Sequence, residues 1–245
     1  MQAMNEYANA IRKLLDEIIS SQTPNIERAA RLMANAIEKD GILYTFGTGH
    51  SHIIAEDVAY RTGGLVPVDA ILEPSLTGHQ QVHKSETMER VEGIAKVIFD
   101  YYQISAKDVM IIISNSGRNA APIEMAQLCQ QQGAPVIAIT SMQHTTGTTS
   151  RHSSGSKLFQ HADVVIDNLC PLGDCLIHLE KLPQPVGPAS GVSGLFILQM
   201  MMVQTIQNLL NDGKEPPVFR SGNLDGSDVF NQKYLEAYKG RIKLW

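Results

Sequence analysis

A serine-rich turn near the middle of the chain has the residue types that bind an anion. Residues 111–119 are an aliphatic run that breaks into serine, asparagine and glycine just before a helical pattern. Serine hydroxyls and free backbone N–H groups at a helix start, with the positive end of the helix dipole, bind phosphate. The same residue types also build ordinary strand-to-helix turns with a capping serine. We predict a phosphate site at Ser114, Asn115, Ser116, Gly117, Arg118 and Asn119.

A second turn of the same kind lies upstream, at residues 43–52. Gly47 and a second glycine two residues later permit tight turning of the backbone. Ser51 supplies another hydroxyl near a helix start, and we predict that it also binds the phosphate. Contacts with the rest of the ligand are predicted for Gly49, His50 and His52.

Strand-like and helical patterns alternate along the chain. Such alternation predicts a parallel sheet with helices on both faces. Ligands of open parallel sheets bind at the carboxyl edge of the strands, which is where both turns fall. The expected strands are 42–46, 65–69, 108–113, 135–139 and 163–167, and the helical patterns are 50–61, 85–102 and 119–132.

Further helical patterns flank this alternating region. Near the N-terminus we predict one amphipathic helix over residues 4–20 and a second that begins at Thr23-Pro24, with Thr23 as its N-cap. Residues 187–210 become apolar almost all round, which predicts a helix buried in a core or between subunits. A polar tail follows at 213–245.

The two turns together resemble those of the sugar isomerase (SIS) domain. In that family the first turn reads Gly-x-Gly-x-Ser and the second Ser-x-Ser-Gly-x-Thr. This sequence matches both, except that Asn119 stands where the family usually has threonine. The resemblance covers residues 25–212. It implies one SIS domain over 1–245, an α/β three-layer sandwich with a central five-stranded parallel sheet of the flavodoxin-like kind flanked by helices.

Four longer segments resemble the UPF0309 branch of this family, whose members are often labelled phosphoheptose isomerase-like. These segments begin at Ser114, Ser150, Asp163 and Glu215. The resemblance implies a protein that binds a phosphorylated sugar and isomerises it between aldose and ketose. It also implies a homodimer or homotetramer with active sites at subunit boundaries.

Three other functions stay open. A muramate-type etherase shares the SIS fold but eliminates instead of isomerising, and a regulatory SIS module binds the sugar phosphate without turnover. A nucleotide-binding protein needs an acid after the second strand, and Asp69 stands about twenty residues after the first turn. The third glycine of a dinucleotide fingerprint is missing, however.

An isomerase needs a base that moves a proton between C1 and C2 of the sugar through an enediolate. The long segment 70–84 is expected to be a loop beside the phosphate turns, and a carboxylate or imidazole there would be well placed. Readings without catalysis also remain open. The segment 70–84 would then be a solvated loop, and the histidine and glutamate on the helix after the first turn would be a surface pair. The candidate catalytic residues are Glu73, His79 and Glu56.

Two further positions bear on the sugar site. Phosphoheptose isomerases carry a catalytic glutamate late in the helix after the first turn, where this chain has Tyr60 and Arg61. This departure argues against a direct transfer of their mechanism.

The Ser-, Thr- and Gly-rich segment 141–156 is expected to be a second long loop, in which His152 either contacts the substrate or caps the next element.

Composition limits the partners and the cellular setting. The 245 residues carry a formal net charge of −5, which argues against a nucleic-acid surface. The first apolar pattern is interrupted by charged residues, so we expect neither a signal peptide nor a membrane span. Three cysteines are too few for a disulfide framework, and we expect a soluble cytoplasmic protein.

Histidine and cysteine pairs suggest metal binding but do not give the spacing of a structural zinc site. The pairs are His50 with His52, His79 with His83, and Cys170 with Cys175. We therefore predict that the protein needs no metal and no cofactor.

Overall fold

A five-stranded parallel sheet forms the centre of the fold. The computed structural model describes residues 2–79 and 81–245. The strand order is β2-β1-β3-β4-β5, and the predicted sheet is confirmed. Parallel strands with both faces covered are near-continuous hydrophobic runs, and β1, β2, β3 and β4 are buried at every position. The strands are β1 Leu43–Gly47, β2 Val68–Ile71, β3 Val109–Ile113, β4 Val136–Thr140 and β5 Val164–Asp167.

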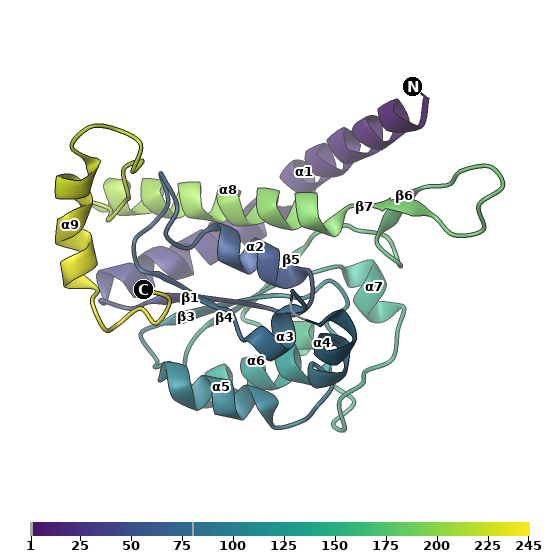
Figure 1. Cartoon of the computed structure of the whole chain (residues 1–245), viewed down its shortest axis with the longest axis horizontal. Coiled ribbons are helices and arrows are strands. Elements are labelled where there is room, and N and C mark those ends of the chain that lie inside the picture. The colour runs from purple at the N-terminus through teal and green to yellow at the C-terminus, as the bar shows by residue number, and fades with distance from the viewer. Residues whose placement is uncertain (1, 80) are drawn as a thin grey trace.

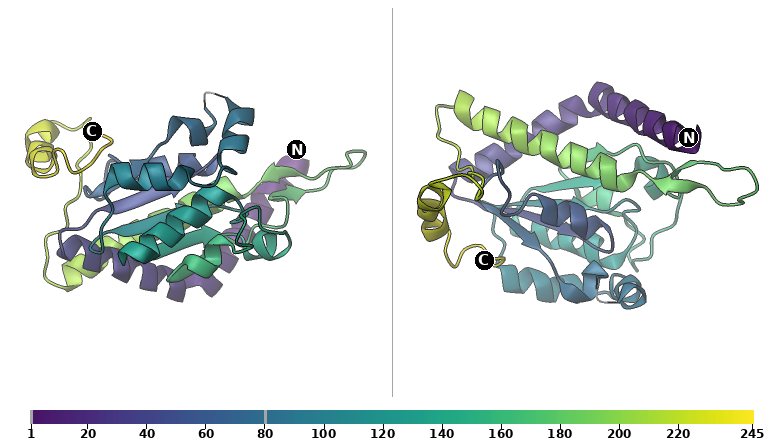
Figure 2. Two further views of the ribbon diagram at one scale, coloured as in Figure 1. Left: turned by 90° about the horizontal axis from the view of Figure 1, so that it is seen from below. Right: turned by 45° about the horizontal axis from the view of Figure 1, so that its top comes forward.

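Helices cover both faces of this sheet, as Figures 1 and 2 show. Side chains alternate along each strand, so Leu43 and Ile111 pack into one apolar layer while Phe46 and Ile112 pack into the other. The first layer is formed with α1 (Gln2–Glu38), α2 (Ser51–Asp57) and α8 (Ser190–Asn211). The second is formed with α5 (Ile94–Tyr102) and α6 (Ala120–Gln132). The α/β three-layer sandwich is thus confirmed.

The N-terminal region is one helix, α1, where the sequence predicted two. Thr23 does not cap a new helix, because its hydroxyl donates back to the Ile19 carbonyl at 2.6 Å. Pro24 within the helix removes one backbone hydrogen bond, at a cost of about 3 kcal/mol. The buried stripe continues on both sides of it, from Ile18 to Ile26. Packing of that stripe against α8 and the sheet offsets the cost of the proline.

The predicted helix over 85–102 is interrupted. It is replaced by α4 (Val82–Met88) and α5, because Gly93 takes a left-handed conformation with φ of 88°. The 70–84 segment is not all loop, since it contains α3 (Pro74–Thr77) and the start of α4. In the 141–156 segment, α7 (Met142–Thr146) precedes the loop. A short 3₁₀ helix, η1, covers Leu158–His161.

A two-stranded hairpin precedes α8. It pairs β6 (Cys175–Ile177) with β7 (Val186–Pro188) and extends away from the sheet beside the start of α1 (Figures 1 and 2). The Tyr7 hydroxyl of α1 donates to the Pro188 carbonyl at 2.9 Å. Gly187 is required at this contact, because a Cβ there would lie 2.8 Å from the Tyr7 ring.

Helix α8 packs mainly against α1, in agreement with the prediction that its apolar sequence is buried in a core or between subunits. Three of its apolar side chains remain exposed, with Val203 at 65% and Leu210 at 52% among them. Within residues 2–79 and 81–245, no helix has the length and apolarity needed to cross a membrane.

The C-terminal tail returns to the sheet through a buried carboxylate. After α9 (Ser227–Ala237), the Lys243 N–H donates to Oδ2 of Asp69 at 2.7 Å. Asp69 lies in β2 at 0% exposure, and its Oδ1 has no hydrogen-bond partner among the described residues. Burial raises the pKa of Asp69 from 3.8 to about 6.

We expect this carboxyl to weaken the fold as the pH rises. A folded-state pKa above the unfolded value means that the folded protein holds its proton longer, so stability falls between about pH 4 and pH 6. Asp69→Asn should remove this pH dependence. The unfolding free energy of the variant minus that of the wild type should therefore be larger at pH 7.5 than at pH 5. Urea unfolding at both pH values measures it. A difference that does not depend on pH would contradict the assignment.

Candidate functional site

A cavity of about 580 Å³ lies where the first and second turns meet. The turns follow β1 and β3, which are neighbours in the sheet and mark the point where the strand order reverses. Open α/β sheets bind their ligands at this switch point, and the volume suits a small ligand. The lining residues are Thr48, Gly49, His50, Ser51, His52, Ile53, Thr77, Gly78, His79, Val82, Ser85, Glu86, Glu89, Ser114, Asn115, Ser116, Asn119, His144 and Asp174.

The second turn is held by its own side chains and by the following strand. The Gly117 N–H donates to Ser114 Oγ at 3.2 Å, and the Ser141 N–H donates to the Asn115 carbonyl at 3.1 Å. Gly117 has φ of 57°, and a Cβ there would lie 3.2 Å from two threonine hydroxyls, so this position favours glycine. Within the described part of the chain, the Ser116 hydroxyl makes no hydrogen bond and lines the cavity.

The first turn brings Ser51 to the same cavity. Gly47 has no room for a side chain, since a Cβ would lie 2.5 Å from the Ser51 carbonyl oxygen. The Gly49 N–H donates to the Leu76 carbonyl at 2.8 Å, which ties the turn to α3. The predicted phosphate residues of both turns therefore reach one cavity from two adjacent strands.

Glu89 joins the two turns, and sequence reasoning missed it. Its carboxylate accepts a hydrogen bond from Thr48 Oγ1 of the first turn and, at 2.6 Å, from Asn119 Nδ2 of the second. Its carbonyl accepts from the Ala121 N–H at 3.0 Å, at the start of α6. The signal in the sequence was Gly93, because a glycine there ends the helical pattern and leaves Glu89 at the end of α4.

Two imidazoles in the cavity have a defined hydrogen bond at Nδ1. His52 Nδ1 contacts the Gly49 carbonyl, and His79 Nδ1 lies 2.6 Å from Thr77 Oγ1. The two rings lie 5.9 Å apart. A carbonyl only accepts, so neutral His52 carries its proton on Nδ1 and leaves Nε2 as a proton acceptor.

His144 and Asp174 complete the wall and were not singled out in the sequence. Burial lowers the pKa of His144 below its usual value, so its ring is mainly neutral near pH 7. Asp174 Oδ1 accepts from the Ser190 N–H at 2.8 Å and thereby caps α8. They come from α7 and from the β6–β7 region, whose packing the sequence patterns did not define.

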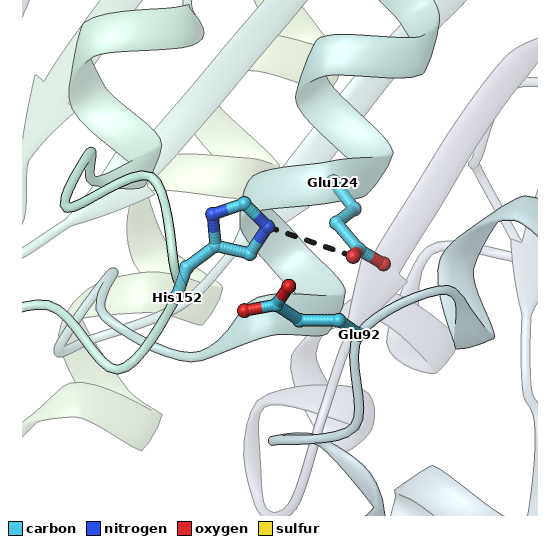
Figure 3. Close-up of side chains that lie close together, drawn as sticks. All are labelled: Glu92, Glu124 and His152. Carbon is cyan, nitrogen blue, oxygen red and sulfur yellow. Dashed lines mark ion pairs between the residues drawn. The ribbon is translucent and has the colours of Figure 1, made fainter.

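Five predicted site residues lie outside the cavity lining. Glu56 is on the outer part of α2, and Glu73 caps α3 by accepting from the Ser75 N–H at 3.2 Å. The Arg118 side chain points toward Thr149, and its Nη2 lies 3.4 Å from Thr149 Oγ1. His152 Nε2 lies 3.5 Å from Glu124 Oε1 (Figure 3). Gly117 is also outside the lining, and its left-handed backbone conformation forms the turn.

Sequence comparison identifies the family. Residues 6–141 match the SIS domain. The chain belongs to the SIS domain family. It is 43% identical over 236 residues to a UPF0309 protein of Halalkalibacterium halodurans, covering 96% of this chain and 98% of that protein. The resemblance to the UPF0309 branch of the SIS family is therefore confirmed.

Solved structures share the SIS fold at low sequence identity. The phosphoheptose isomerase of Neisseria gonorrhoeae superposes with a TM-score of 0.58 at 18% identity, covering 84% of this chain and 97% of that one. The Vibrio vulnificus NanR protein complexed with ManNAc-6P gives a TM-score of 0.56 at 14% identity, covering 97% and 70%. At these identities the likeness establishes the fold alone.

Proposed function

We propose that the cavity binds a phosphorylated sugar and that the protein isomerises it between aldose and ketose. The observation that carries the proposal is the convergence of Ser51, Ser114 and Ser116 on one cavity at the switch point of the sheet. Serine hydroxyls and the positive start of α6 suit a phosphate at that end. Proteins of this fold include a phosphoheptose isomerase and a protein complexed with ManNAc-6P, which favours the same ligand class.

His79 is the base in this proposal. The Thr77 hydroxyl lies 3.4 Å from the Pro74 carbonyl and 2.6 Å from His79 Nδ1. If its single proton is donated to the carbonyl, Thr77 accepts from Nδ1–H and Nε2 carries the free lone pair. Nε2 then takes the proton from C2 of the aldose, which gives an enediolate. It returns that proton to C1 while the proton on O2 moves to O1, so that the ketose forms.

Glu86 is the second acid–base group of the proposal. It lines the same cavity from α4. Within residues 2–79 and 81–245, no protein group hydrogen-bonds its carboxylate, so it is available to protonate or deprotonate the sugar oxygens. Glu56 and Glu73, which were also predicted from the sequence, are not used because both lie outside the lining.

Binding without turnover is the second candidate function. The region where phosphoheptose isomerases have a catalytic glutamate holds Tyr60 and Arg61, and Arg61 pairs with Asp57 at 2.8 Å outside the cavity. A regulatory module would need the phosphate turns but no base. The predicted homo-oligomer, assembled through the exposed apolar side chains of α8, is retained as part of both proposals, and sedimentation at micromolar concentration tests it.

Deuterium exchange separates the two functions. The protein is first screened by thermal shift with a panel of aldose and ketose phosphates, ManNAc-6P among them, because a ligand of the native state raises the melting temperature. The best ligand is then incubated with protein in D₂O. We expect deuterium at C1 or C2 as the enediol is reprotonated from solvent. A ligand that binds but shows neither exchange nor conversion would establish the regulatory function instead.

A further inference from the structure

Three metal-ligating side chains converge outside the proposed sugar-phosphate cavity. Glu92 comes from the segment between α4 and α5, Glu124 from α6, and His152 from the loop after α7 (Figure 3). One potential ligand atom of each lies within 4.8 Å of the other two. None of the three lines the cavity at the turns. They come from separate parts of the chain, so no local sequence motif predicts that they lie together.

Each carboxylate of this cluster is oriented by backbone donors. The Gly93 N–H donates to both oxygens of Glu124, at 2.8 and 2.9 Å. The Ser153 N–H and hydroxyl donate to the two oxygens of Glu92, at 2.6 and 2.8 Å. Hydrogen bonds of this kind fix the direction of metal-ligating carboxylates in known sites.

The imidazole is oriented in the same way. His152 Nδ1 lies 2.7 Å from Ser154 Oγ, and its Nε2 faces Glu124 Oε1 at 3.5 Å. Nδ1 also accepts from the Ser154 N–H at 3.2 Å, so neutral His152 without a metal carries its proton on Nε2. A metal at Nε2 takes the place of that proton, which moves to Nδ1, where the Ser154 hydroxyl accepts it. The side chains of His152 and Glu124 are only 10% and 14% exposed, so few waters compete for this space.

We propose that Glu92, Glu124 and His152 bind one divalent transition-metal ion, with Zn²⁺ as the preferred metal. An imidazole nitrogen with two carboxylate oxygens suits Zn²⁺, whereas Mg²⁺ and Ca²⁺ favour oxygen ligands alone. Ligand atoms of a tetrahedral zinc site lie about 3.4 Å apart, because each bond is about 2.1 Å. A small inward movement of the exposed Glu92 side chain reaches that spacing, and water fills the fourth position.

The ion would link the loop that carries Glu92 to α6 and to the loop that carries His152. The neighbour of His152, Arg151, donates to Asn119 Oδ1 at 3.1 Å, and Asn119 in turn holds Glu89 in the cavity wall. The proposed metal is therefore structural. It is independent of the proposed isomerase reaction and is not required to take part in it.

Zinc titration of chelator-treated protein tests the site. We expect calorimetry to give one equivalent of Zn²⁺, with a rise in melting temperature that MgCl₂ at the same concentration does not produce. Glu124→Gln and His152→Gln should each weaken the affinity at least tenfold. The matched control His83→Gln changes an exposed histidine of α4 outside the cluster and should bind zinc as the wild type does.

A second pair of variants controls for zinc binding in the cavity instead of at the proposed site. His52 and His79 lie close enough in the cavity to attract zinc, so His52→Gln and His79→Gln are titrated in parallel. Zinc binding that survives in the Glu124 and His152 variants, or is lost in the cavity variants instead, would overturn the proposal, as would the absence of binding. Circular dichroism in EDTA checks that each variant folds, and Glu92→Gln at the exposed ligand should weaken binding without loss of structure.

Discussion

The double variant Ser51→Ala with Ser116→Ala should bind sugar phosphates about 10²- to 10⁴-fold more weakly than the wild type, since each lost hydrogen bond to a charged group contributes about 1.5 to 3 kcal/mol. Both hydroxyls belong to residues that line the cavity, and they approach it from two different turns. Calorimetry with the best ligand of the thermal-shift screen measures the loss, and inorganic phosphate serves as a second probe.

A matched double variant controls for the removal of two hydroxyls. Ser20 and Ser21 are exposed on α1, where each donates to the Glu17 carbonyl, and they lie outside the cavity. Ser20→Ala with Ser21→Ala should leave the affinity for sugar phosphates unchanged. Equal affinity in the cavity variant and the wild type would remove these turns from the phosphate site, whatever the reaction is.

The sequence predicted the sheet well because its signals are local. Continuous aliphatic runs define buried parallel strands, and glycines with hydroxyl residues mark the turns that follow them. Ten of the nineteen lining positions belong to those two turns or their immediate helix starts: Thr48, Gly49, His50, Ser51, His52, Ile53, Ser114, Asn115, Ser116 and Asn119. The proposed phosphate side of the cavity was therefore accessible to sequence reasoning.

The N-terminal helix was mispredicted because local propensity competed with long-range packing. Thr23-Pro24 is a strong start signal for a helix. Contact of α1 with α8, a segment far away in the chain, keeps the helix continuous across the proline. A single sequence does not show which segments meet, so it does not show when packing overrides a local signal.

The proposed catalytic side of the cavity was harder to predict for a related reason. Whether Glu73 or Glu89 reaches the cavity depends on where α3 begins and where α4 ends. Pro74 starts α3, so Glu73 becomes its cap and turns toward the backbone. Gly93 separates α4 from α5, so Glu89 turns toward both phosphate turns. A shift of a few residues in an element boundary thus decides which carboxylate faces the ligand.

His79→Gln should reduce turnover by about 10² to 10⁴ while leaving ligand affinity nearly unchanged, because a general base acts chiefly in the transition state. Glutamine keeps a polar side chain of similar reach but cannot take up a proton. Deuterium incorporation at C1 or C2 should fall by the same factor as turnover, because both depend on the same proton transfer. The matched control is His83→Gln, an exposed histidine on α4 that does not line the cavity, and it should retain wild-type exchange. If His79→Gln retains exchange and Glu86→Gln abolishes it, the carboxylate is the base and the imidazole only binds; if both retain it, neither group carries the proton transfer that isomerisation requires.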